Sequence, residues 1–175
     1  MLNESYPKRF NTLFSVKSSL ISLYLALTFP IVFITIESLK LISTFCLICG
    51  LIFIFNITND YVITDEKSIV LKTSLISNLF GKNGWEILWK DIINVKSFST
   101  SQGSKVHYLI TSSQKSFLIP QRLERFDEFK EILISKIKNL EIDLNYISPL
   151  WTYKFLTIIS SVMFLGEIYA FIIII

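Results

Sequence analysis

The chain of 175 residues is 51% hydrophobic, with 17 basic and 14 acidic residues and a net charge of +3. This nearly even balance of basic and acidic residues argues against nucleic-acid binding, which needs a strongly basic surface. The single histidine excludes a multi-histidine metal site, and no glycine-rich phosphate loop or known catalytic motif occurs. We therefore expect no enzymatic activity, no cofactor and no metal ion.

The charged residues gather in the middle of the chain, where residues 59–149 hold 23 of the 31. The flanking stretches 18–58 and 150–175 carry only two charged residues each. This distribution indicates a water-soluble domain at 59–149 between membrane segments.

Three apolar stretches are long enough, at about 1.5 Å per residue, to cross or nearly cross a membrane as helices. They are residues 18–39, 41–58 and 155–175. The first two predict a transmembrane hairpin over 18–58 after an N-terminal segment at 1–17, and the third predicts a last transmembrane helix within 150–175. No small-residue cleavage site follows the first stretch, so we interpret it as retained rather than as a signal peptide.

Basic residues near the ends of the spans predict the orientation. Lys8, Arg9 and Lys17 precede the first span, whereas the loop to the second span offers only Lys40. The N-terminus and the middle domain should therefore lie in the cytoplasm, with Ile175 on the far side. We expect a multi-pass protein of a bacterial inner membrane or of a thylakoid or plastid membrane.

Cys46 and Cys49 have the C-x-x-C spacing of a redox pair or of half a zinc site. Inside a membrane helix, the same spacing also places two small apolar side chains on one face. Because no further cysteine could complete a metal site, we favour the structural interpretation.

Turn residues divide the middle domain into short pieces with strand character. The predicted strands are YVIT (61–64), SIVLKT (68–73), LISNLF (75–80), WEILW (85–89), IINVKSFS (92–99), KVHYLIT (105–111) and SFLI (116–119). Asn83-Gly84 predicts a tight hairpin between the third and fourth of them. The spacing indicates a meandering antiparallel sheet.

A helix is predicted to follow the last strand, which Pro120 ends because proline cannot donate to the sheet. Apolar residues recur there at helical spacing, namely Phe126, Phe129, Leu133, Ile137 and Leu140. We expect an amphipathic helix over 126–140 to cover the open end of the sheet's core, which gives a small α+β domain.

Many strands followed by one helix resembles the pleckstrin-homology-like (PH-like) superfamily, and more narrowly the bacterial membrane proteins with a PH-like domain, including the YcxB-like family. The matching pieces are YVITDEKSIVL (61–71), ILWKDIINV (87–95), FLIPQR (117–122) and FDEFKEILISKI (126–137). The resemblance implies an antiparallel PH-like sheet or barrel capped by its C-terminal helix, usually preceded by a transmembrane hairpin. It also implies that Trp89, Ile92 and Pro120 are core and turn positions.

Lysines dominate the strand region of the domain. Between residues 67 and 115 there are two acids and seven lysines, namely Lys67, Lys72, Lys82, Lys90, Lys96, Lys105 and Lys115. A lysine-rich rim could bind anionic lipid headgroups or a partner, each lysine near a membrane surface contributing about 1 kcal/mol. Alternatively, the lysines protect strand edges from pairing with other sheets.

Glu167 lies in the last span, 13 residues beyond Lys154 and about 20 Å along a helix. A carboxylate in hydrocarbon costs a few kcal/mol, so it should be protonated, paired or turned toward another helix. We favour a contact that selects a partner helix. The alternatives are a proton or ion relay, or a protonated side chain bonded to Ser160, Tyr169 or a backbone carbonyl.

His107 lies on a predicted strand, where we expect a surface or half-buried position rather than a catalytic base. The leading hypothesis is a non-enzymatic membrane protein whose domain binds another protein, which includes a second copy, or less readily a lipid headgroup. The alternative is an assembly or stability factor of a larger membrane complex, such as a photosynthetic one. A transporter or enzyme would depend on Glu167 or His107 alone.

Overall fold

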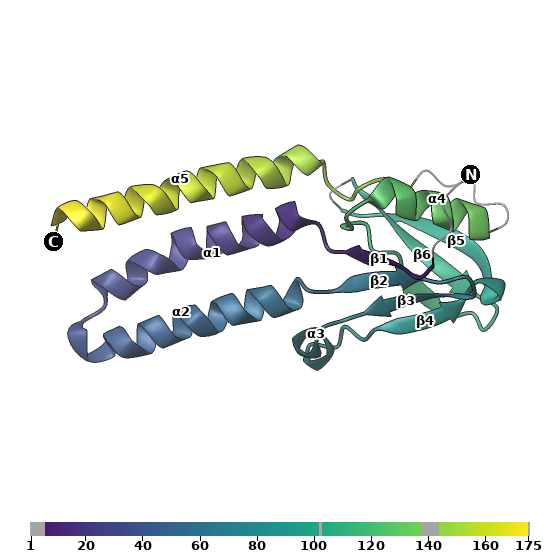
Figure 1. Cartoon of the computed structure of the whole chain (residues 1–175), viewed down its shortest axis with the longest axis horizontal. Coiled ribbons are helices and arrows are strands. Elements are labelled where there is room, and N and C mark those ends of the chain that lie inside the picture. Colours follow the sequence, from purple (N-terminus) through teal and green to yellow (C-terminus); the bar gives the residue numbers. More distant parts are fainter. Residues whose placement is uncertain (1–5, 102, 138–143, 175) are drawn as a thin grey trace. The chain divides into compact units, whose positions relative to one another are not determined.

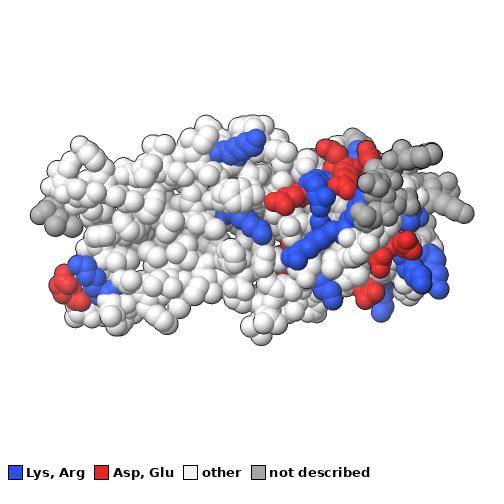
Figure 2. Space-filling model, in the orientation of Figure 1, with Lys and Arg blue, Asp and Glu red and all other residues white. Residues whose placement is uncertain are grey.

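A computed structural model describes residues 6–101, 103–137 and 144–174 (Figure 1). The chain forms two compact units, each assembled from separate stretches of sequence. The helical unit comprises residues 14–58 and 149–175, and the sheet unit comprises residues 1–13 and 59–148. Figure 2 shows that most charged side chains belong to the sheet unit.

The helical unit contains three helices long and apolar enough to span a membrane. They are α1 (Phe14–Ile34), α2 (Glu37–Ile57) and α5 (Leu150–Ile174). The predicted spans lie largely within these helices, but all three helices begin four or five residues before the predicted starts. Between α1 and α2 only two residues remain for the turn.

Small residues allow α1 and α5 to pack closely along their length. Ser19 and Ala26 of α1 and Ser160 of α5 are each at most 3% exposed. The hydroxyl oxygens of Ser22 and Ser160 lie 2.7 Å apart, and farther along the helices the rings of Phe33 and Phe171 stack at 4.1 Å. The contact residues occur in the same order along both helices, so α1 and α5 run parallel.

The contact between α1 and α2 depends on a glycine. The Tyr24 hydroxyl donates to the carbonyl of Leu47 (3.2 Å). A Cβ atom at Gly50 would lie only 2.0 Å from that hydroxyl. Any larger side chain at this position would therefore displace Tyr24 from the backbone of α2.

Two antiparallel sheets make up the strand part of the sheet unit. The first has the order β1-β2-β3-β4 and the second has the order β5-β6-β7. The strands are β1 (Lys8–Asn11), β2 (Tyr61–Thr64), β3 (Ser68–Lys72), β4 (Trp85–Leu88), β5 (Ile92–Ser99), β6 (Lys105–Thr111) and β7 (Ser116–Leu118). A 3₁₀ turn, η1 (Trp89–Asp91), connects the two sheets. The predicted antiparallel α+β class is therefore confirmed. The barrel form is not confirmed, because the described strands form no closed barrel.

The strand β1 was not predicted, since residues 1–17 were interpreted as a segment outside the domain. It pairs antiparallel with β2, with Phe10 opposite Val62. Both of these side chains are fully buried. The α1–α2 hairpin is therefore inserted between the first and second strands of the sheet unit in the sequence.

The prediction of a strand at 75–80 is wrong, because this segment forms the short helix α3 (Leu75–Leu79). The Ser74 hydroxyl caps the helix by accepting a hydrogen bond from the Ser77 N–H (3.1 Å). Gly81, with a φ of 79°, ends the segment in the left-handed conformation that glycine tolerates. The predicted hairpin at Asn83-Gly84 is also absent, and β4 pairs with β3 instead.

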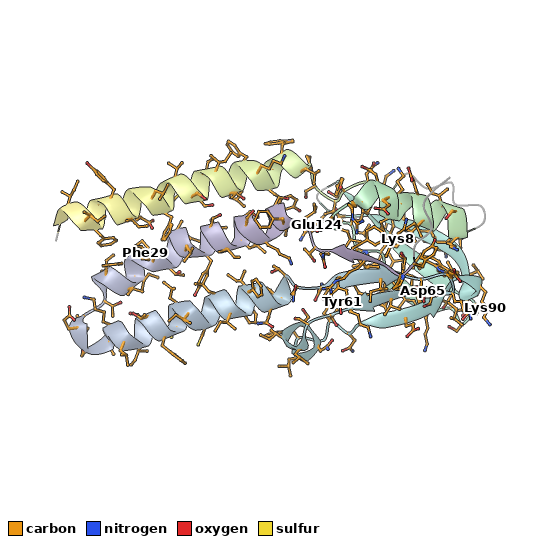
Figure 3. The ribbon with its side chains drawn as sticks, viewed as in Figure 1. Lys8, Phe29, Tyr61, Asp65, Lys90 and Glu124 are labelled. Atoms are coloured by element: carbon orange, nitrogen blue, oxygen red, sulfur yellow. The ribbon has the colours of Figure 1, made fainter. Side chains whose placement is uncertain are left out.

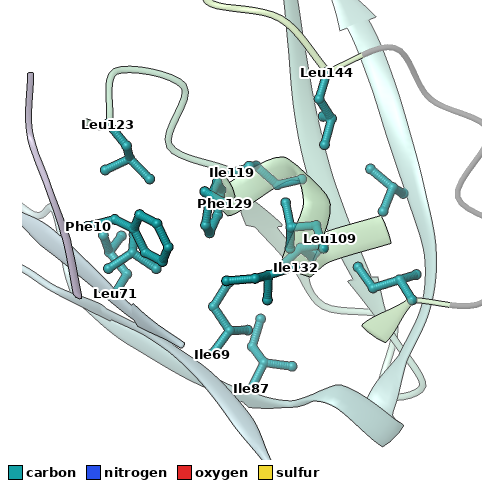
Figure 4. Close-up of a cluster of buried hydrophobic side chains, with 14 of the residues drawn as sticks. Phe10, Ile69, Leu71, Ile87, Leu109, Ile119, Leu123, Phe129, Ile132 and Leu144 are labelled. Atoms are coloured by element: carbon teal, nitrogen blue, oxygen red, sulfur yellow. The ribbon is translucent and has the colours of Figure 1, made fainter. Parts of the chain in front are cut away.

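The helix α4 (Phe126–Lys136) closes the core, as predicted, although the predicted end at Leu140 lies outside the described residues. Phe126, Phe129 and Leu133 are each at most 1% exposed. Figure 4 shows how Phe129 and Ile132 meet side chains from both sheets in one cluster.

Candidate functional site

The outer face of the β5-β6-β7 sheet carries apolar side chains. Along β6, the inward residues His107, Leu109 and Thr111 are buried, and the outward ones, Val106, Tyr108 and Ile110, are half-buried. An antiparallel sheet with one solvated face usually presents polar residues there. Here the outward set is the more apolar one.

Neighbouring strands extend this face on both sides. On β5, Phe98 is 54% exposed, and its ring lies 5.6 Å from that of Tyr108 in an edge-on arrangement. On β7, Leu118 is 46% exposed and pairs in register with Tyr108. We call Phe98, Val106, Tyr108, Ile110 and Leu118 the outer patch.

Lys96 borders the outer patch. It pairs in register with Tyr108, two residues before Phe98 on the same face of β5, and its side chain is exposed. Among the described strands, β5 pairs only with β6, so Lys96 also lies on a sheet edge. A lysine here suits both predictions made for the lysines, the binding of a partner and the protection of a strand edge.

The remaining lysines do not form one surface. Lys67, Lys90 and Lys115 lie in three turns at one end of the strands, which we call the turn end. Trp89 at this end donates from its backbone N–H to the Lys67 carbonyl (3.0 Å) and from its ring N–H to the Asp65 carbonyl (2.8 Å). Figure 3 labels Asp65 and Lys90 in this region.

Lys72, Lys82 and Lys105 lie at the opposite end, which we call the connection end because the chain leaves it toward the apolar helices. Lys72 pairs in register with Tyr61, four residues after the end of α2. Lys105 follows Ser104, whose hydroxyl donates to the carbonyl of Ile147 (2.9 Å), just before α5.

A buried carboxylate organises the connection end. Asp60, with only 8% of its side chain exposed, binds the ammonium group of Lys82. It also accepts hydrogen bonds from the Ser74 N–H (3.0 Å) and the Ser77 hydroxyl (3.3 Å). Three partners make up for the carboxylate's lost hydration. The sequence alone did not indicate this cluster, because Asp60 is 14–22 residues away from its partners.

Lys8 and Arg9 have structural roles that charge counting did not predict. The Lys8 ammonium forms a salt bridge with Glu128 of α4 (3.0 Å), and the Arg9 guanidinium lies 3.7 Å from the centre of the Tyr61 ring. Both contacts fasten β1 to its neighbours. The segment KRFN contains a single apolar residue, Phe10, so no alternation marked it as a strand.

His107 is buried, at 1% exposure, so the expectation of a surface or half-buried position is wrong. Its Nδ1 lies 2.8 Å from the Ser97 hydroxyl on β5. This hydrogen bond satisfies a polar ring on the inner face of the sheet. His107 therefore lies on the face opposite the outer patch.

Glu167 lies in the row of α5 side chains that faces α1. It is three residues from Phe164 and four from Phe171, and both rings contact Phe29 of α1 (5.0 and 6.2 Å). Its Oε2 atom is shielded and has no hydrogen-bond partner among the described residues. Pro30 leaves the Ala26 carbonyl of α1 without its usual helical donor.

The described residues contain no group of three or more histidine, cysteine or acidic side chains placed to hold a metal ion. Cys46 and Cys49 are free thiols, exposed on the surface of α2.

Comparison with known proteins gives one relative and no family. An uncharacterised protein of the cyanobacterium Synechocystis is 25% identical over 154 residues, which cover 85% of this chain and 77% of the relative. No family model matches the sequence. No solved structure matches the fold.

Proposed function

We propose that this chain is a non-enzymatic membrane protein whose sheet unit binds a partner protein through the outer patch. The observation that carries the proposal is the apolar outward face of the β5-β6-β7 sheet. Phe98 and Leu118 expose about half of their surface there, on either side of Tyr108. Contiguous exposed apolar side chains of this kind are typical of protein interaction sites.

The chemistry of the patch favours a particular partner surface. Aromatic side chains supply large contact areas at interfaces, and Phe98 and Tyr108 already fix one another's orientation. Lys96 at the border would attract an acidic side chain on the partner. The expected partner is therefore a protein, either a second membrane protein or a second copy of this chain, with an apolar surface and an acid at its rim.

We also propose that the sheet unit is of the PH-like type, located in the cytoplasm. Two antiparallel sheets of four and three strands followed by one closing helix support this assignment. In this chain, the predicted membrane hairpin is an insertion into the PH-like domain after its first strand. The basic N-terminal residues support the cytoplasmic location.

A photocrosslinking amino acid at position 98 or 118, incorporated in native membranes, tests the partner contact. We expect a discrete protein adduct at both positions, and a clear loss of the adduct when Lys96→Glu is added. The matched control is Ile134 on α4, which is also 46% exposed but lies away from the patch. Equal adducts at position 134, or lipid adducts alone at 98 and 118, would overturn the proposal.

The alternative is an assembly or stability factor of a larger membrane complex. The origin of the relative in a cyanobacterium, a photosynthetic organism, favours a photosynthetic complex as the target. Identification of the crosslinked protein separates the two proposals. A subunit of a photosynthetic complex, together with lower abundance of that complex when the gene is deleted, would favour the assembly role.

A further inference from the structure

The short helix α3 presents apolar side chains outward. Leu75 and Leu79, one helical turn apart, are 83% and 85% exposed. Phe80, directly after the helix, is 74% exposed. On the opposite side of the helix, Ser77 is buried at 4% exposure. A soluble domain has no reason to place two leucines on the outside of a five-residue helix.

Hydrogen bonds fix α3 in position, although a helix of this length is unstable alone. Its capping residue Ser74 donates its N–H to the Asp60 carboxylate (3.0 Å), which also binds Ser77 and Lys82. The helix is thereby fastened directly to the second residue of the sheet unit after α2.

The length of chain then places α3 close to a membrane surface. Asp60 is the third residue after Ile57, the last residue of the apolar helix α2. Three residues span at most about 11 Å. Interfacial helices bury their apolar side about 5–10 Å into the boundary between headgroups and acyl chains. Asp60, to which α3 is bonded, is therefore tethered within about that depth of the end of a helix long and apolar enough to span a membrane.

Basic residues flank α3 on both sides. Lys72 precedes it with an exposed side chain, and Lys82 follows it with 60% of its side chain exposed. Long basic side chains beside an apolar segment reach anionic headgroups while the apolar side chains enter the membrane.

We propose that α3 lies in the interface of the membrane that the chain's own apolar helices enter. Leu75 and Leu79 enter the boundary of the acyl chains, and Lys72 and Lys82 lie among anionic headgroups. This lipid contact involves the connection end of the sheet unit and is independent of the protein contact proposed for the outer patch.

Spin-label accessibility in the purified full chain tests the proposal. The background carries Cys46→Ala and Cys49→Ala, both at exposed positions, and a label is attached at Leu79→Cys. The protein is reconstituted in nanodiscs of phosphatidylglycerol and phosphatidylcholine, which contain no other protein. We expect the label to collide several-fold more with oxygen, which partitions into lipid, than with a water-soluble nickel chelate. A label at Lys90→Cys, at the turn end, should show the reverse preference.

A second pair of variants controls for local unfolding. Leu75→Ser should shift the label at position 79 toward the nickel chelate by several-fold, whereas Ile134→Ser, at an exposed position on α4, should leave it unchanged. Nickel accessibility at position 79 equal to that at position 90 in the unmodified background would overturn the proposal. Such a result in pure lipid would indicate that α3 binds a protein instead.

Discussion

The ring of Phe10 lies 5.4 Å from that of Phe129, so the strand before the membrane hairpin and the last helix of the sheet unit share one core. Both side chains are completely buried. Residues on the two sides of the α1–α2 hairpin in the sequence therefore depend on each other for folding.

Phe10→Ala should destabilise the sheet unit. Truncating a fully buried phenylalanine costs about 3–5 kcal/mol, a large share of the roughly 5–15 kcal/mol that stabilises a small domain. Limited proteolysis should then cleave within residues 59–137 while the apolar helices stay in the membrane. Phe14→Ala, at a 72% exposed position, is the control and should leave the digestion pattern unchanged. Equal resistance of both variants would mean that β1 is dispensable.

Phe129→Ala should have the same effect from the other side of this contact. The reason is the loss of a side chain that meets both Phe10 and Phe126 (5.4 and 6.1 Å). The same digestion assay applies, with Ile134→Ala on the exposed side of α4 as the control. An intact domain in Phe129→Ala would contradict the role of α4 as the closing element.

The orientation of the chain can be tested by thiol labelling in a background without Cys46 and Cys49. A membrane-impermeant maleimide should reach Lys90→Cys only from the cytoplasmic side, and Lys40→Cys, in the first turn of α2, only from the other side. The expected asymmetry follows from the basic residues near the start of the first span. Labelling of both positions from one side would refute the hairpin topology.

The parallel packing of α1 and α5 predicts a disulfide bond. Ser22→Cys combined with Ser160→Cys should crosslink readily under mild oxidation, because the native hydroxyl oxygens are 2.7 Å apart. Ser22→Cys with Val162→Cys should not, since Val162 is 64% exposed on another side of α5. Crosslinking is read as a mobility shift after cleavage between the two helices. Equal yields for the two pairs would contradict the helix packing.

Substitutions of Glu167 distinguish a role in docking a partner helix from a role as a proton relay. If the side chain makes a polar contact with a partner helix, Glu167→Gln should be tolerated and Glu167→Leu should weaken copurification of the partner. Such a contact is worth about 0.6–2 kcal/mol in a membrane. A relay would instead lose function in both variants while the complex stays intact. Wild-type behaviour of both variants in both assays would leave Glu167 without a role.

Tyr146 predicts how the sheet unit responds to alkaline pH. Burial raises the pKa of its phenol above the usual value of 10.0, and the Asp127 carboxylate adds to the rise, although a backbone hydrogen bond at Phe126 opposes it. Because the folded pKa is the higher one, this stabilisation is complete below about pH 10 and is lost as the pH rises through the folded value. Tyr146→Phe keeps the ring contact with Phe126 (4.8 Å) and should flatten the alkaline part of the stability curve. If the slope of stability against pH between pH 9 and 11 were the same in Tyr146→Phe, the pH dependence would not come from Tyr146.

Periodicity predicted most of this fold. The strands β2, β5 and β6 occur at the predicted residues, because alternation over four to eight positions is a strong local signal. The apolar spacing of α4 was equally informative. At 75–80, the run of apolar residues was compatible with a strand, and the capping serine at Ser74 decided for a helix.

The candidate site was less accessible to sequence reasoning. The alternation in β6 was visible, but which of its two faces is buried depends on α4 and on residues of the first sheet. Lys96 was among the predicted binding residues, whereas Phe98 and Leu118 were not, since exposed apolar residues on strands cannot be recognised without the fold. The Asp60 cluster joins positions 14–22 residues apart, which no local pattern reveals.

The pairing of β1 with β2 also imposes an order of biogenesis. Residues of β1 leave the ribosome first, yet their partner strand emerges only after both helices of the hairpin have been synthesised, since Asn11 pairs with Tyr61. Until then, β1 has no partner strand, and the pairing closes a loop that contains the whole α1–α2 hairpin. If α1 and α2 span a membrane, their insertion therefore precedes the pairing of β1 with β2 and decides on which side the sheet forms.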